Sequence, residues 1–202
     1  MRVNDCIGCT DFPCTDVRHE CYLVPQIEVD PSQISIVMIS EASPPDPGDY
    51  YYAEGNPLFE QTTVQAFRDA GAQVGSIQDL LSMEVYLTTA VKCGKSGYGI
   101  QTRTIETCSH ILEAELDLFP EVQVYLLMGD VAIKALNYIA KRQGGRRVIP
   151  AGSTYKIRGN TYHFRGKRAF PSYLQAGPSF FIEKSKRKMI GEDIAEALRM
   201  VK

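Results

Sequence analysis

The fold of this chain is decided by residues 34–44, ISIVMISEASP, where a short apolar run passes directly into a polar loop. The run at 34–39 is rich in β-branched residues, which predicts a strand buried on both faces, as in a parallel sheet. The following stretch, 40–60, contains four prolines, two glycines and three consecutive tyrosines. It predicts a long irregular loop, and such loops after buried strands often carry function.

Strands and helices alternate beyond this stretch. Further strands are predicted at 85–91, at 122–128 and from Arg168, with helices at 62–70, 76–82, 102–118, 131–142 and 184–201 and a hairpin at 153–165 that turns at Gly159-Asn160. The alternation predicts a three-layer α/β/α sandwich around a mostly parallel, four-stranded sheet. We expect one domain spanning residues 1–202, with a cysteine-rich arm at 1–30. Ligands of such folds meet the loops at the carboxyl ends of the strands.

The net charge of −2 conceals a strong asymmetry. Residues 1–91 carry 14 acidic and 3 basic side chains, whereas residues 92–202 carry 10 acidic and 19 basic ones. Between Lys141 and Lys188 only Glu183 is acidic, against 13 bases. So basic a segment indicates a polyanionic partner, although a solvated surface is the ordinary explanation of a single charge run.

Several classes of protein are disfavoured by what the sequence lacks. There is no apolar run long enough for a membrane helix and no apolar core of a signal peptide near Met1, so we expect a cytoplasmic protein. Walker A, GxGxxG and GxSxG motifs are absent. None of the three histidines falls in the loops at 40–60, 92–99 or 171–182, which disfavours a histidine general base.

Six cysteines form a second pattern. Four of them lie near the N-terminus: Cys6, Cys9, Cys14 and Cys21. Cys93 follows a predicted strand, and Cys108 lies on a predicted helix. Without a secretory signal, a disulfide framework is not expected. A CxxC pair such as Cys6 and Cys9 can grip one metal centre from a tight turn, and two more thiolates would complete a four-sulfur site.

The ordered set of motifs resembles the iron–sulfur class (family four) of the uracil-DNA glycosylase superfamily. The matching segments are the CxxC at 6–9, SEASP at 40–44, GNPLF at 55–59, YLTTAVKC at 86–93, Cys108, LLMG at 126–129, FPSY at 170–173 and Pro178-Ser179. Each motif is short, but together they span nearly the whole chain in the family's order.

The resemblance implies a [4Fe–4S] cluster held by Cys6, Cys9, Cys93 and Cys108, which would tie the arm to the core. A structural zinc site on the same thiolates is the alternative, because four cysteines suit both groups. Cys14 and Cys21 have no counterpart in the family pattern. They are interpreted as buried thiols, or as alternative ligands if the arm folds differently.

The resemblance also implies an enzyme that flips a uracil out of DNA and hydrolyses its glycosidic bond. Glu41 matches the position that activates the attacking water, and hydrogen bonding to the loop backbone is its equally weighted alternative. The neighbouring Ser40 and Ala42 are assigned to base binding. Phe59 becomes the ring that stacks on the base if the loop shifts by one residue, and otherwise it belongs to the core.

Two positions depart from the family pattern. Thr89 stands where an asparagine reads the edge of uracil, and a hydroxyl is a shorter and less directional partner than an amide. Gly177 stands where a histidine stabilises the departing uracil anion, and nearby Gln175 offers only an uncharged donor. Such stabilisation is usually a large catalytic effect. Base recognition therefore looks rebuilt, which predicts a different substrate base or a weak or inactive relative.

A DNA partner agrees with the basic C-terminal half. The predicted DNA contacts are Lys92, Lys95, Ser179, Phe180, Lys184, Lys186 and Arg187. Phe180 and Phe181 occupy the loop where the family carries an apolar wedge that fills the gap left by a flipped base. Packing against the last helix is the alternative for at least one of the two rings. We expect a monomer.

Two rival functions remain open at this point. One is a nucleic-acid-binding module that kept the scaffold without catalysis. The other is an enzyme acting on a free nucleobase or nucleotide, with a loop at 50–52 closing its pocket.

Overall fold

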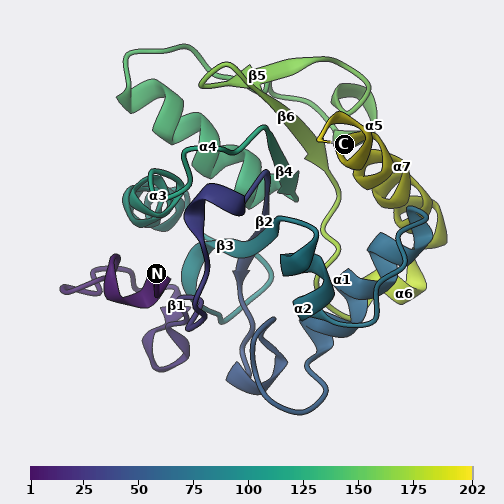
Figure 1. The fold of residues 1–202 in the computed structure, drawn as a ribbon. Helices are drawn as coiled ribbons and strands as arrows, with labels where there is room; N and C mark the ends of the chain where they lie inside the picture. The colour runs from purple at the N-terminus through teal and green to yellow at the C-terminus, as the bar shows by residue number, and fades with distance from the viewer. Residues whose placement is uncertain (202) are drawn as a thin grey trace.

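The computed structural model describes residues 1–201, which build one six-stranded sheet covered by helices on both faces (Figure 1). The strands run β1-β3-β2-β4-β6-β5 across the sheet. Their bounds are β1 Val17–Arg18, β2 Ile36–Ser43, β3 Val85–Lys95, β4 Val124–Met128, β5 Tyr162–Phe164 and β6 Lys167–Ser172. The four central strands are parallel and correspond to the four that were predicted. The prediction of four strands in total was wrong, because β1 and β5 add short antiparallel edges.

Seven helices surround the sheet within the described residues. They are α1 Leu58–Asp69, α2 Ile77–Ser82, α3 Thr102–Leu116, α4 Asp130–Arg142, α5 Thr154–Ile157, α6 Ser179–Ile182 and α7 Lys184–Met200. Helices α3 and α4 cover one face, and α1 and α7 cover the other (Figure 1). Alternate residues of β2 enter the two cores: Val37 and Ile39 face α3 and α4, whereas Ile36 and Met38 face α1 and α7. The continuous apolar run that predicted this strand is thus explained by burial on both sides.

The predicted hairpin is displaced along the chain. The segment expected to form its first strand contains the short helix α5, so the turn predicted at Gly159-Asn160 was wrong. The real hairpin joins β5 to β6 through Arg165 and Gly166, whose φ values are +52° and +75°. Positive φ at both central residues matches the twist of a tight two-residue hairpin.

The three consecutive tyrosines after β2 are structural. Tyr50 and Tyr51 are buried in the core against α1. The Tyr52 hydroxyl donates to the carbonyl oxygen of Leu87 at 2.9 Å and accepts from its N–H at 3.1 Å. It therefore occupies the edge of β3 at a point that β1, paired only with Gly94 and Lys95, does not reach. The suggestion that these tyrosines close a pocket is not supported by this packing.

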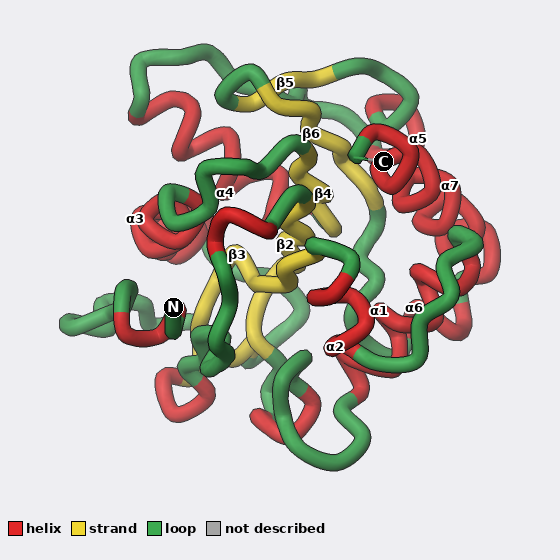
Figure 2. Tube along the Cα trace, viewed as in Figure 1, coloured by secondary structure: helices red, strands yellow, loops and turns green. Residues whose placement is uncertain are grey.

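The N-terminal arm, residues 1–30, is mostly loop (Figure 2); it contains β1 and packs against α3. Its start is fixed to its end, because the Met1 amino group donates to the Val29 carbonyl at 2.8 Å and Arg2 forms a bridge with Glu28. The arm also reaches the sheet, where Leu23 N–H donates to the Lys92 carbonyl at 2.8 Å. Among residues 1–201, no helix is both long and apolar enough to cross a bilayer.

Candidate active site

Glu41 lies near the carboxyl end of β2 with its side chain 16% exposed. It packs against Gly129, the residue before α4, where an added Cβ would lie 2.7 Å from Oε1 of Glu41. Gly129 also has φ +101°, so both the backbone and the close approach require glycine. Lys95, from the end of β3, places Nζ 3.4 Å from Oε2 of Glu41. A partly exposed carboxylate and ammonium thus meet at the edge of the sheet where ligands of this fold class bind.

A neutral network is buried between β2 and α1 and includes Ser40, the residue before Glu41. Gln175 Nε2 donates to the Tyr51 hydroxyl at 3.0 Å and to Thr63 Oγ1 at 3.3 Å, and its Oε1 accepts from Ser40 Oγ at 3.1 Å. Ser40 and Tyr51 also hydrogen-bond to each other. Burial raises the pKa of Tyr51 to about 12, although bonds to Ser40 and Gln175 oppose the shift. We call these four residues the amide network.

The amide network bears on the role predicted for Gln175. Its side chain is fully buried, and its amide hydrogens already have protein acceptors. A departing base therefore has no free donor at Gln175 in this arrangement. Nothing in the local sequence pointed to the buried partners Tyr51 and Thr63.

The predicted base-binding side chains are also buried. Ser40 and Thr89 face each other in the register of β2 and β3, and both have zero exposure. Ala42 is 6% exposed, and Phe59 is 9% exposed with its ring 5.3 Å from that of Tyr51. The core alternative for Phe59 therefore describes its packing here. A base reaches these side chains only after their covering neighbours have moved.

A charged network is buried on the opposite face of the sheet, between β3 and α3. Lys92 and Glu115 form an ion pair with no exposure. The Lys92 ammonium also donates to Thr88 Oγ1 at 2.7 Å, and the Tyr86 hydroxyl donates to Glu115 Oε1 at 2.7 Å. Lys92 was predicted to contact DNA, but in this structure its charge is enclosed and paired with Glu115. We call Tyr86, Thr88, Lys92 and Glu115 the charged network.

The final loop separates its two phenylalanines. Phe180, predicted to contact DNA, lies in the short helix α6, where it is 2% exposed and belongs to the core beside α7. Phe181 is 44% exposed and Ile182 is 76% exposed. The exposed apolar side chains of this segment are therefore those of Phe181 and Ile182, and not that of Phe180. Gly177 has φ +109° with open space around its missing Cβ, so a histidine there would be strained.

The family can be assigned from these features together with the match to known proteins. A family model of the uracil DNA glycosylase superfamily matches residues 27–193, which include all four parallel strands and Glu41. The chain belongs to the uracil-DNA glycosylase superfamily. It is also similar to the type-5 uracil-DNA glycosylase of Thermus thermophilus, with 29% identity over 122 residues. That match covers 60% of this chain and 53% of the relative, so the chain spans about half the length of the curated relative it matches.

In this superfamily member, the polar and basic side chains predicted to meet DNA differ in exposure and in pairing. Lys184 and Ser179 are exposed. Lys186 is paired with Glu183 at 2.6 Å. Arg187 donates from Nη2 to Asp69 Oδ1 at 2.8 Å, and this hydrogen bonding lowers the pKa of Asp69. Contact of Arg187 with a phosphate would therefore compete with an internal ion pair.

Four cysteines line a small cavity between the arm, β3 and α3. Cys9, Cys14, Cys93 and Cys108 enclose about 20 Å³ together with apolar side chains. Cys6, predicted as a ligand, is exposed and does not line the cavity; its thiol donates to the Arg2 carbonyl at 3.5 Å. Cys14, to which the family pattern gave no role, lines the cavity instead. Its signal in the sequence was only its spacing from Cys9.

The cavity has the donor chemistry of a sulfur-ligated group. Burial, with the neighbouring thiols, raises the pKa of Cys93 to about 12, and burial raises the pKa of Cys108 to about 11. His19 Nε2, which also lines the cavity, is buried without a hydrogen-bond partner. In residues 1–201 no three cysteine, histidine or acidic side chains stand close enough to hold a metal ion. The thiols thus surround a common space, but not at ligation distance.

Proposed function

We propose that this protein is a DNA glycosylase that hydrolyses the N-glycosidic bond of a flipped uracil or another damaged base. The observation that carries the proposal is the pairing of Glu41 with Lys95 at the carboxyl edge of the sheet. Membership of the uracil-DNA glycosylase superfamily supports DNA as the partner. The similarity to a type-5 uracil-DNA glycosylase supports a damaged base as the substrate.

The chemistry assigned to Glu41 is activation of water. Its carboxylate accepts a proton as the water oxygen attacks the anomeric carbon of the sugar, while the bond to the base breaks and its electron pair leaves with the base. The start of α4, next to Gly129, places the positive end of a helix dipole beside this carboxylate. The proton then passes from Glu41 to solvent or to the departing base.

Lys95 is the cation that we assign to the departing base anion. Gly177 supplies no side chain, and Gln175 is enclosed in the amide network. The Lys95 ammonium is 31% exposed and lies beside the carboxylate that would direct the attack. A preorganised charge at such a position typically contributes about 10²–10³-fold in rate.

The first experiment is an abasic-site assay on DNA containing uracil or other damaged bases. Glu41→Gln should reduce base release by about 10²-fold or more, because an amide cannot accept the water's proton. Glu54→Gln is the matched control, since Glu54 is an exposed carboxylate in the loop that follows β2, the strand of Glu41. Salt-dependent DNA binding without any abasic product would instead favour the non-catalytic module. The burial of Ser40 and Thr89 is the observation that speaks for that module.

The role of Lys95 is tested by varying the leaving group. Lys95→Met should slow release of uracil strongly, but slow release of 5-fluorouracil less, because a more stable anion needs less support. Lys95→Arg should retain most activity. An equal loss for both bases would assign Lys95 only to binding or to folding.

We further propose that the thiol cavity holds a [4Fe–4S] cluster, with structural zinc as the alternative. Such a group would tie the arm to β3 and α3 and would supply the charge that thiolates need. Cys9, Cys93 and Cys108 keep the ligand roles implied by the family pattern, and the cavity favours Cys14 over Cys6 as the fourth. Metal analysis after anaerobic purification should show loss of iron in Cys14→Ser and retention in Cys6→Ser. A colourless protein with stoichiometric zinc would replace the cluster by zinc.

A further inference from the structure

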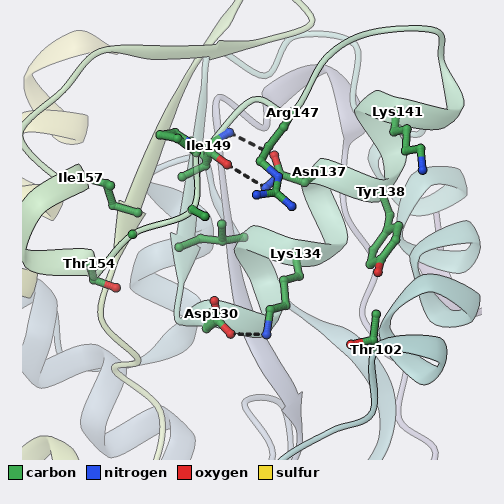
Figure 3. A pocket seen from close by; sticks show the side chains of 14 residues that line it. Thr102, Asp130, Lys134, Asn137, Tyr138, Lys141, Arg147, Ile149, Thr154 and Ile157 are labelled. Atoms are coloured by element: carbon green, nitrogen blue, oxygen red, sulfur yellow. Dashed lines mark hydrogen bonds and ion pairs between the residues drawn. The ribbon is translucent and has the colours of Figure 1, made fainter.

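A separate cavity lies over the outer face of α4 (Figure 3). It encloses about 510 Å³, between the segment 147–157 on one side and the start of α3 at Thr102 on the other. Its lower end is Asp130, the residue after Gly129, and it extends from there along α4 as far as Lys141. Glu41 and Lys95 do not line it. The volume is in the range of small-molecule sites, typically about 300–1,000 Å³.

One wall of this cavity is held rigidly. The Asn137 side chain, on α4, donates from Nδ2 to the Ile149 carbonyl at 2.9 Å, and its Oδ1 accepts from the Ile149 N–H at 3.0 Å. Figure 3 shows this pair of bonds between the helix and the 147–157 segment. Ile133, Ile149 and Ile157 give the cavity apolar lining, and all three are buried. The cavity is thus a formed feature rather than a gap beside a loose loop.

The rim of the cavity is basic and partly aromatic. Lys141 and Arg147 are exposed, and in residues 1–201 neither side chain forms an ion pair. Lys134 is paired with Asp130 at 2.5 Å, so the charge at the lower end is locally balanced. Tyr138 adds a half-buried ring. Two unpaired cations next to an apolar floor and an aromatic ring match the chemistry of a base that carries a phosphate.

We propose that this cavity binds one nucleotide unit outside the Glu41 site, with its base against the apolar floor and its phosphate against Lys141 and Arg147. The inference does not depend on excision of any base. The unit has two sources with the same chemistry, a free nucleoside monophosphate and a nucleotide within a single DNA strand. In the second case, the cavity would hold DNA that runs past the start of α4, beside Glu41.

Amide NMR shifts of the whole protein test the site directly. We expect thymidine monophosphate or a short oligothymidylate to shift the backbone amides of Asn137 and Ile149. Shifts with both probes identify a mononucleotide site, and shifts with the oligonucleotide alone identify a strand site. If neither probe shifts these amides, or if inorganic phosphate binds as tightly as both probes, the proposal is overturned.

A pair of neighbouring arginines supplies the matched control. Arg147 lines the cavity, whereas Arg146 is exposed and does not. Arg147→Glu should weaken binding of the probe about 10-fold or more, and Arg146→Glu about 3-fold or less, since only the first removes a direct phosphate contact. Equal losses would mean general attraction to the basic segment and would contradict a site. Because binding is measured without turnover, a protein that excises no base still gives a decisive result.

Discussion

The two polar networks on opposite faces of the sheet are built differently. The charged network, between β3 and α3, encloses an ion pair. The amide network, between β2 and α1, encloses only neutral groups. Both are fully sequestered from solvent at their centres, Lys92 and Gln175. Because removing one member of a buried ion pair strands a charge, whereas removing a neutral member strands only a hydrogen-bonding group, the two faces should tolerate substitution unequally.

The charged network should give the largest effect. Lys92→Met leaves Glu115 buried without its cation, so the free energy of unfolding should fall by about 3–5 kcal/mol. Urea denaturation measures this change. Lys95→Met is the control, since that lysine is partly exposed in a 3.4 Å pair and should cost about 1 kcal/mol or less. Similar losses for the two variants would show that burial of the ion pair does not determine the cost of removing its cation.

The amide network should give an intermediate effect. Gln175→Ala removes the shared partner of Ser40, Tyr51 and Thr63, and the free energy of unfolding should fall by about 1–3 kcal/mol. Gln78→Ala, at an exposed position of α2, should change it by less than about 0.5 kcal/mol. A loss for Gln175→Ala as large as that for Lys92→Met would show that charge is not what separates the two faces.

The partly exposed ion pair of Asp69 and Arg187 should give the smallest loss of unfolding free energy. The hydrogen bond from Arg187 lowers the pKa of Asp69 below its ordinary 3.8. The carboxylate therefore stabilises the fold above that pH, and the contribution is lost as the pH falls through the lowered value. Asp69→Asn should cost about 0.2–1 kcal/mol near neutral pH. In thermal unfolding at a series of pH values, the gap between the two proteins should close in acid; a constant gap would point to packing instead.

The sequence predicted the parallel strands well because their apolar runs are continuous and their connections are helical. It also placed Glu41 and Lys95 in loops at the same edge of the sheet, where they meet. It did not predict the burial of Lys92, because the partner of this lysine, Glu115, is 23 residues away and nothing local marks the pairing. Tyr86 and Lys92 lie an even number of positions apart and so lie on the same face of the strand. That spacing was the available indication that Lys92 points into the core.

Local irregularity explains the other differences between the sequence predictions and the structure. The family pattern suggested Cys6, but the arm is mostly loop, so spacing alone could not decide between Cys6 and Cys14. In the final loop, a four-residue helix turns Phe180 inward and Phe181 outward. In the 153–165 segment, Gly159-Asn160 resembled a hairpin turn, whereas Arg165-Gly166 formed it.

The Tyr52 hydroxyl on the edge of β3 has a consequence for self-association. An unpaired strand edge is a template on which another chain can add a strand and begin to aggregate. Here the backbone of Leu87 is occupied by Tyr52, the Thr89 carbonyl by the Lys92 ammonium and the Lys92 carbonyl by the Leu23 N–H. A second copy cannot extend the sheet along this edge without displacing these groups. Side chains and one loop thus protect a strand of eleven residues that its two-residue neighbour leaves largely uncovered.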